Sequence, residues 1–234
     1  MRGTLGNGQP LAIYDLGTVG YQEALNLQHR LVSLRQQGRI ADTLLLLEHP
    51  PVITQGRSAD SEDIVADPTV LARHGVEVVT IERGGETTYH GPGQLVGYPL
   101  IDLRQYLRSL KKYIYLLEEV FVSYLDKHHG VDATRDANHR GVWVGNEKIT
   151  AVGVAVQQRV TFHGFAFNVN TDLSHFEWII PCGITDRGQT SVQALTGEQT
   201  DMPAVKRGVA TAFCELFGYA EPPFSSAADL PREE

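Results

Sequence analysis

The stretch from Arg83 to Leu103 constrains this chain more than any other, because it joins a glycine-rich loop to an apolar strand. Five glycines and two prolines fall within its 21 residues, yet residues 95–101 keep the apolar character of a strand. Glycine lets a backbone approach a ligand closely, and proline fixes the turn between such residues. Polar side chains alternate with these glycines, namely Arg83, Tyr89, His90 and Gln94. The pattern predicts one wall of a binding site, although a glycine-rich hairpin turn would carry the same residues.

The composition is that of an ordinary globular protein. A chain of 234 residues with 42% hydrophobic and 21% charged residues is long enough for one large core or two small ones. The net charge of −8 gives no support for nucleic-acid binding, and the chain has no apolar run of membrane length and no signal-peptide core. The two cysteines are too few for a disulfide scaffold. We therefore expect a reduced, cytoplasmic protein.

Hydrophobic periodicity and glycine or proline boundaries predict alternating helices and strands. We expect helices over residues 20–35, 67–74, 104–129 and 202–219, and strands over residues 43–48, 52–56, 76–82, 95–101, 142–144, 148–154 and 161–170. No internal repeat or change of composition marks a domain boundary. The sequence predicts one α/β (α+β) domain over residues 11–220, with a mixed, largely antiparallel sheet flanked by helices. Residues 1–10 and 221–234 are expected to be flexible.

Cys182 and Lys148 are candidates for chemistry. Cys182 lies between Pro181 and Gly183, in a segment where a thiol is accessible and backbone amides can point at an oxyanion. The alternative, a small buried hydrophobe, suits Cys214 better because it flanks the apolar stripe of the last expected helix. Lys148 opens an apolar strand, where it is either a solvated strand end or an ammonium directed into a pocket.

Motifs for metal or nucleotide binding are missing from the sequence. The nine histidines form no HExxH pattern, and the chain has neither a Walker loop nor a Gly-x-Ser-x-Gly elbow. The glycines at 91, 93 and 97 miss the dinucleotide-binding spacing and precede a strand. His90 and His163 each precede a glycine, and each alone is more typical of a structural histidine. We expect no metal and no cofactor.

Five motifs together closely resemble the lipoyl(octanoyl) transferases in order and spacing, over roughly residues 12–218. They are Arg83-Gly-Gly-x-x-Thr-Tyr-His-Gly-Pro-Gly-Gln-Leu, Lys148-Ile-x-Ala-x-Gly-Val, His163-Gly-Phe-Ala-x-Asn-Val-Asn-x-Asp-Leu, Pro181-Cys-Gly-Ile and Thr190-Ser. Thr150 and Phe167 stand where relatives often carry Ala and Leu, which would adjust the volume of the pocket. The first ten and last fourteen residues lie outside the resemblance.

The resemblance implies an enzyme that moves an octanoyl group from acyl carrier protein to a lysine of a lipoyl domain. Such acceptors are the lipoyl domains of 2-oxoacid dehydrogenases and the glycine-cleavage carrier protein, and the fold is shared with lipoate and biotin protein ligases. Cys182 would be the nucleophile and Lys148 its partner, lowering the thiol pKa. Lys148, His90 or, as an accessory residue, His163 would accept the proton of the acceptor lysine. The implied acyl pocket consists of Arg83, Gly84, Gly85, Glu86, Thr87, Thr88, Tyr89, His90, Ala151, Val152, Gly153, Gly164, Phe165 and Ala166.

Two other functions fit the same fold. An ATP-dependent lipoate-protein ligase would use a similarly placed lysine, but it needs no cysteine, so the Pro-Cys-Gly segment argues against it. A non-catalytic acyl- or carrier-binding module would not need both Lys148 and Cys182.

A basic face on the expected helix over residues 104–129 is a candidate docking site for the acidic acyl carrier protein. Arg104, Arg108, Lys111 and Lys112 share one side of this helix if it is continuous. A solvated surface would show the same pattern.

Overall fold

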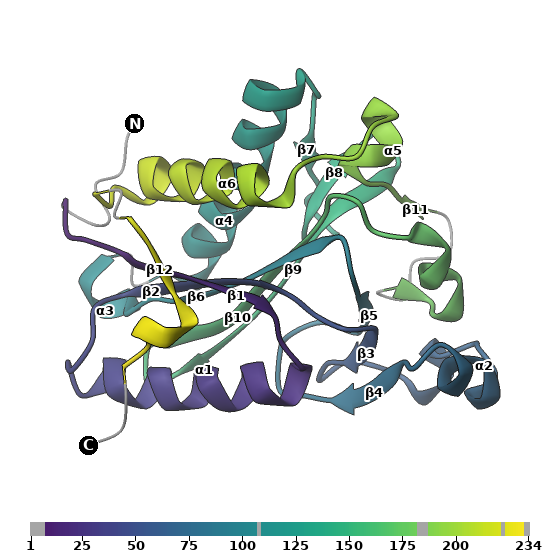
Figure 1. The fold of residues 1–234 in the computed structure, drawn as a ribbon, viewed down its shortest axis with the longest axis horizontal. Helices are drawn as coiled ribbons and strands as arrows, with labels where there is room; N and C mark the ends of the chain where they lie inside the picture. Colours follow the sequence, from purple (N-terminus) through teal and green to yellow (C-terminus); the bar gives the residue numbers. More distant parts are fainter. Residues whose placement is uncertain (1–7, 107–108, 182–186, 221–222, 232–234) are drawn as a thin grey trace.

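A mixed sheet forms the centre of the protein in the computed structural model, which describes residues 8–106, 109–181, 187–220 and 223–231 (Figure 1). Its strands are β1 (Ala12–Thr18), β2 (Thr43–Glu48), β6 (Gln94–Leu100), β7 (Thr134–Arg135), β8 (Val142–Val144), β9 (Glu147–Gln157), β10 (Val160–Asn168), β11 (Gly188–Gln189) and β12 (Phe224–Ser226). Among the described residues the strand order is β12-β1-β2-β6-β10-β9-β8-β7, with β11 beside β9. The five pairings from β2 to β7 are antiparallel, whereas β12 with β1, β1 with β2 and β9 with β11 are parallel. The predicted mixed, largely antiparallel sheet is therefore confirmed.

Helices cover both faces of this sheet. The α-helices of the described residues are α1 (Tyr21–Gln36), α2 (Pro68–Arg73), α3 (Leu103–Tyr106), α4 (Leu110–His129), α5 (Val192–Thr196) and α6 (Met202–Phe217), and α2 packs beside the smaller sheet described below. Figure 1 shows α1 along one face and α4 with α6 along the other. Along β6, Val96 and Tyr98 pack in the cluster on the α1 side, and Leu95 packs in the cluster of α4 and α6. The central strands β6 and β10 are buried at every position, which is why they are almost continuously apolar.

The long helix predicted over residues 104–129 is wrong, because the structure has two helices there, α3 and α4. Ser109 has an extended backbone, with φ of −132°, and its hydroxyl accepts a hydrogen bond from the backbone N–H of Lys112. Ser109 is thus the N-cap of α4, a role that serine fills well because its oxygen satisfies a free N–H of the first turn. Leu110, at the start of α4, is 38% exposed, whereas Leu117 and Phe121 are fully buried.

The break also separates the residues of the expected basic face. Arg104 belongs to α3, and its Nε and Nη2 atoms both donate hydrogen bonds to the carboxylate of Asp102. Lys111 and Lys112 lie exposed on α4, and Arg108 lies outside the described residues. The spacing argument for one continuous basic face therefore fails. None of the helices that the structure describes is both long and apolar enough to cross a lipid bilayer.

A smaller sheet carries the first half of the glycine-rich stretch. Its strands are β3 (Val52–Gln55), β4 (Glu77–Thr80) and β5 (Thr87–His90), in the order β4-β3-β5. After β5 the chain turns at Gly93 and enters β6 of the main sheet. Gly93 has a φ of +80°, and a Cβ there would lie 2.4 Å from the carbonyl oxygen of Asn170. Only glycine fits this turn, which joins the two sheets.

The C-terminal segment adds an edge strand to the main sheet. The sequence predicts a flexible tail over residues 221–234, whereas Phe224–Ser226 pairs in parallel with β1. Arg30 of α1 holds the end of this segment, because its guanidinium donates to the carbonyl oxygen of Pro231 at 2.8 Å. Backbone pairing with an open sheet edge explains the strand, although its sequence is polar.

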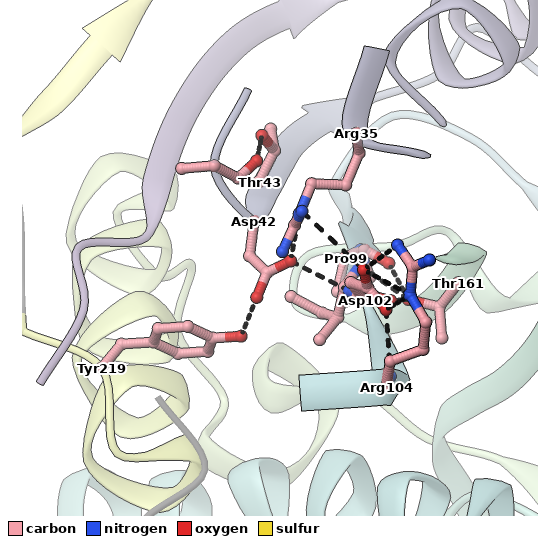
Figure 2. A network of polar contacts seen from close by, with 10 residues as sticks. Arg35, Asp42, Thr43, Pro99, Asp102, Arg104, Thr161 and Tyr219 are labelled. Atoms are coloured by element: carbon pink, nitrogen blue, oxygen red, sulfur yellow. Dashed lines mark hydrogen bonds and ion pairs between the residues drawn. The ribbon is translucent and has the colours of Figure 1, made fainter. Parts of the chain in front are cut away.

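A buried polar network ties α1 to the strands of the main sheet (Figure 2). The carboxylate of Asp42 accepts hydrogen bonds from Arg35 Nε at 2.7 Å and from the hydroxyl of Tyr219 at 2.9 Å. Asp42 also accepts from the backbone N–H of Asp102, at 2.9 Å. Burial opposes ionisation of Asp102, but the hydrogen bonds from Arg104 outweigh it and lower its pKa. The network fixes the C-terminal end of α1 against the start of β2.

Candidate active site

A cavity of about 360 Å³ lies between the glycine-rich segment 83–90 and the hairpin formed by β9 and β10. Its volume falls within the range of small-molecule sites, about 300–1,000 Å³. It is lined by Tyr21, Arg83, Gly84, Gly85, Glu86, Thr88, His90, Val96, Tyr98, Asn138, His139, Arg140, Lys148, Ala151, Val152, Gly153, His163, Gly164, Phe165 and Ala166. The three separate motifs around residues 83–90, 148–153 and 163–166 thus meet at one cavity.

Two residues expected in the pocket do not line this cavity, namely Thr87 and Tyr89. Successive side chains of a strand point to opposite faces, so Thr88 and His90 of β5 line the cavity and Thr87 and Tyr89 face away. Thr87 donates its hydroxyl hydrogen to Asp63 Oδ2 at 2.8 Å, and the hydroxyl of Tyr89 lies 2.7 Å from His175 Nδ1. These two contacts attach β5 to the chain around Asp63 and to the chain around His175.

The floor of the cavity is made of small residues on paired strands. Ala151 pairs with Ala166, and Gly153 pairs with Gly164, across the antiparallel β9–β10 ladder. The backbone N–H of Gly84 donates to the carbonyl oxygen of Val154 at 3.2 Å, which brings the glycine-rich segment close to this ladder. The alanine part of this floor leaves room for a straight alkyl chain, whereas Arg83 and Gly84 lie close over Gly153.

A chain of buried amides holds the glycine-rich stretch in place. His90 Nδ1 lies 2.8 Å from Gln94 Oε1. Gln94 Nε2 donates to the carbonyl oxygen of Tyr89 and to Asn168 Oδ1, and Asn168 Nδ2 donates to the carbonyl oxygen of Thr190. Since the amide nitrogen of Gln94 is used in this way, its oxygen faces His90, and we assign the ring proton of His90 to Nδ1. The segment near Thr190 is thereby linked to the cavity wall.

Three buried histidines at or next to the cavity, His49, His90 and His163, are neutral at physiological pH. Burial, together with the neighbouring His49, lowers the pKa of His90 to about 3. Burial, together with the positive charge of Arg83, lowers the pKa of His163 to about 3. Burial likewise lowers the pKa of His49 to about 4; its Nε2 lies 2.7 Å from the hydroxyl of Tyr98. None of these rings is a strong proton acceptor in the free protein.

His163 has an unusual backbone for a strand residue. Its φ is +54°, in the left-handed region, and its N–H donates to Gln28 Oε1 at 2.7 Å instead of to a strand. The ladder between β10 and β6 ends at Phe165 paired with Gly97, next to Pro99, which has no N–H. Among the described residues neither ring nitrogen of His163 has a hydrogen-bond partner.

Lys148 is buried, so the alternative of a solvated strand end is wrong. Its side chain is 3% exposed and lines the cavity, and its Nζ lies 4.9 Å from the ring centroid of Trp143. On β9 it pairs with Trp143 of β8 on one side and with Gln189 of β11 on the other. The backbone N–H of Thr190 donates to the carbonyl oxygen of Lys148 at 2.9 Å. Cys214, in contrast, is buried in the core between α4 and α6, as expected.

Cys182 lies outside the described residues, but both flanks of its segment 182–186 are fixed. On one side, the backbone N–H of Ile180 donates to the carbonyl oxygen of Asp63 at 2.7 Å. On the other side, Arg187 donates to Asp136 Oδ2 at 2.7 Å, and the following residues form β11 against Lys148. The described chain therefore contacts Asp63 just before segment 182–186 and the candidate lysine just after it.

Six residues that line the cavity were not predicted from the sequence, namely Tyr21, Val96, Tyr98, Asn138, His139 and Arg140. The alternation of β6 places Val96 and Tyr98 on one face, which the sequence does show. Residues 138–140 form a short loop in which the carboxylate of Asp136 accepts the backbone N–H groups of Asn138 and His139. An aspartate two residues before an asparagine is a signal for such a turn.

Comparison with known proteins agrees with the fold and with the motifs. The family described as "Lipoyl protein ligase A/B catalytic domain" matches residues 20–214. A protein named Octanoyltransferase from Caldicellulosiruptor bescii is 53% identical over 87% of this chain and 90% of its own length. Another protein of that name, from Desulforamulus reducens, is 47% identical over 89% of this chain and 92% of its own length.

Solved structures share the fold at low sequence identity. A bi-partite lipoate protein ligase from Thermoplasma acidophilum superimposes with a TM-score of 0.71 at 15% identity, covering 94% of this chain and 88% of that one. A biotin protein ligase from Aquifex aeolicus gives a TM-score of 0.55 at 16% identity, covering 89% and 70%. The chain belongs to the lipoyl protein ligase A/B catalytic-domain family.

Proposed function

We propose that this protein is an octanoyltransferase that moves an octanoyl group from acyl carrier protein to a lysine of a lipoyl domain, through a thioester on Cys182. The main support for this proposal is the position of Lys148. It is buried and lines a cavity whose floor is made of alanine and glycine, and its strand pairs with β11, which follows segment 182–186. The names of the two relatives, at 53% and 47% identity, support octanoyl transfer.

In the first half-reaction the thiolate of Cys182 attacks the carbonyl carbon of the donor thioester. The bond from that carbon to the carrier sulfur breaks, and the leaving thiolate takes a proton from the ammonium of Lys148. A positive charge beside the thiol favours the thiolate, because the ammonium lowers the pKa of the thiol from its ordinary value of about 8.5. Exchange of one thioester for another changes the bond energy little, so this step needs no ATP.

In the second half-reaction the acceptor lysine attacks the acyl-enzyme. Neutral Lys148 takes the proton of the attacking amine, an amide forms, and the thiolate of Cys182 leaves. His90 and His163 are weaker choices for this proton, since each has a pKa of about 3 in its buried position. A general base works best when its pKa lies near the working pH. We assign the base to Lys148, because the first half-reaction leaves its amine neutral and able to accept a proton.

Mass spectrometry tests the proposal. After incubation with octanoyl-acyl carrier protein, the intact mass is expected to rise by one octanoyl group, and the modified peptide to contain Cys182. Cys182→Ala is expected to abolish the adduct, and Cys214→Ala, which alters only a buried core residue, is the matched control. An adduct that persists in Cys182→Ala contradicts the proposal.

Transfer without ATP separates this function from that of a ligase. Addition of a lipoyl domain is expected to clear the adduct and octanoylate one lysine, with no nucleotide present. Transfer that starts only when ATP is added would instead assign an adenylating ligase.

A further inference from the structure

We infer that Trp143 is a positioning residue of this active site, which holds the ammonium of Lys148 and the chain that follows segment 182–186 against one indole ring. This inference rests on the proposed function. Trp143 belongs to β8 and is 2% exposed. Over its ring lie Lys148 Nζ, at 4.9 Å from the centroid, and Arg187 Cζ, at 4.7 Å.

The face of an indole ring attracts cations, and the attraction grows when water is excluded. Lys148 is buried, so its ammonium has lost most of its hydration. Arg187 has a second partner besides the ring, because its guanidinium also donates a hydrogen bond to Asp136 Oδ2 at 2.7 Å. The ring thus brings together two cations that lie on opposite sides of segment 182–186 in the sequence.

The indole N–H adds a third link. It donates to the carbonyl oxygen of His139 at 3.1 Å, and His139 lines the cavity together with its neighbours Asn138 and Arg140. Asp136 accepts the backbone N–H groups at the start of this loop, as well as the guanidinium of Arg187. One side chain therefore contacts the lysine, the residue that follows segment 182–186 and a wall of the cavity.

Core packing alone would make a different prediction. If Trp143 only fills space, its replacement lowers the melting temperature but leaves the chemistry of the folded fraction unchanged. If it positions the two cations, replacing the ring by an aliphatic side chain weakens the stabilisation of the thiolate. The apparent pKa of the Cys182 thiol then rises, whereas the reactivity of the fully ionised thiol stays the same.

The test measures the rate of iodoacetamide alkylation of Cys182 between pH 5 and 10, with Cys214 replaced by Ala in every variant. Trp143→Leu is expected to slow alkylation roughly tenfold at pH 7, with equal rates near pH 10. Trp143→Phe keeps an aromatic face but loses the indole N–H, so we expect a reduction of no more than about threefold. The contrast between Leu and Phe isolates the ring face, because both variants lack the hydrogen bond to His139.

Arg187→Gln provides a second variant in case Trp143→Leu fails to fold, since the Arg187 side chain is partly exposed. It is expected to shift the profile in the same direction by a smaller amount, and Arg187→Lys to restore it. A profile for Trp143→Leu, or for Arg187→Gln, that superimposes on the parent profile overturns the inference. A parent thiol with no reactivity at neutral pH also overturns it. Failure of the proposed function shows itself separately, as the absence of an octanoyl adduct on the wild-type protein.

Discussion

Gly164→Ala is expected to destabilise the protein by forcing two central strands apart. A Cβ on Gly164 would lie 2.2 Å from the carbonyl oxygen of Gly97 and 2.6 Å from Pro99 Cδ. Heavy atoms pack best at about 3.5–4.0 Å, so the new methyl group intrudes by more than about 1 Å. Neither clashing group can move away by side-chain rotation, because one is the backbone of a buried strand and the other is a proline ring.

Overpacking of a core typically costs about 1–3 kcal/mol. For a domain of this size each kcal/mol lowers the melting temperature by about 2–4 °C, so Gly164→Ala is expected to lower it by roughly 2–12 °C. Differential scanning calorimetry on the purified variant measures this shift.

Gly153→Ala is the matched control, because Gly153 is the cross-strand partner of Gly164 on the same cavity floor. A Cβ on Gly153 would lie 3.1 Å from the carbonyl oxygen of Gly84 and 3.2 Å from Arg83 Cδ, which asks for shifts of only a few tenths of an ångström. We expect a melting temperature within about 2 °C of the wild type, with a raised KM for the octanoyl donor because the cavity narrows. Equal melting temperatures for the two variants would refute the argument from close strand approach.

Two further predictions concern buried polar groups. Arg35→Met leaves the carboxylate of Asp42 buried without its cation, so urea denaturation should show a loss of about 3–5 kcal/mol; a loss below about 1 kcal/mol would show that the network in Figure 2 contributes little. His163 has a pKa of about 3 when folded and an ordinary value of 6.5, so the unfolded chain binds more protons between these values and stability falls as the pH drops from 6.5 towards 3. His163→Gln removes this contribution, and its melting temperature should fall less between pH 6.5 and pH 4.5 than that of the wild type; an identical fall would contradict the assignment.

Much of the fold was predictable because its signals are local. The strand over residues 43–48 matches β2 at both ends, since both of its faces are covered and the run is continuously apolar. The glycine-rich stretch was recognisable because its tight turn, with a φ of +80° at Gly93, requires glycine.

Other features depend on contacts that a single sequence does not contain. Thr87 and Tyr89 are as polar as Thr88 and His90, so the alternation of β5 divides these residues into two faces without saying which face meets the cavity. The break before α4 had a local signal in Ser109, but apolar residues at 103, 107, 110 and 114 keep a helical spacing across it and favoured one helix. In both cases the tertiary environment decides between two readings that the local pattern allows.

Successive side chains of β5 point to opposite faces, so this short strand contacts two different parts of the protein. Thr88 and His90 line the cavity, whereas Thr87 reaches Asp63, whose carbonyl oxygen holds Ile180. Tyr89, on the same face as Thr87, contacts His175 in the segment that leads to residue 182. A displacement of β5 would therefore move the wall of the acyl cavity and the approach to the candidate nucleophile together. Because the two faces belong to one strand, β5 links the wall of the cavity to residues 175 and 180, which precede the candidate nucleophile in the chain.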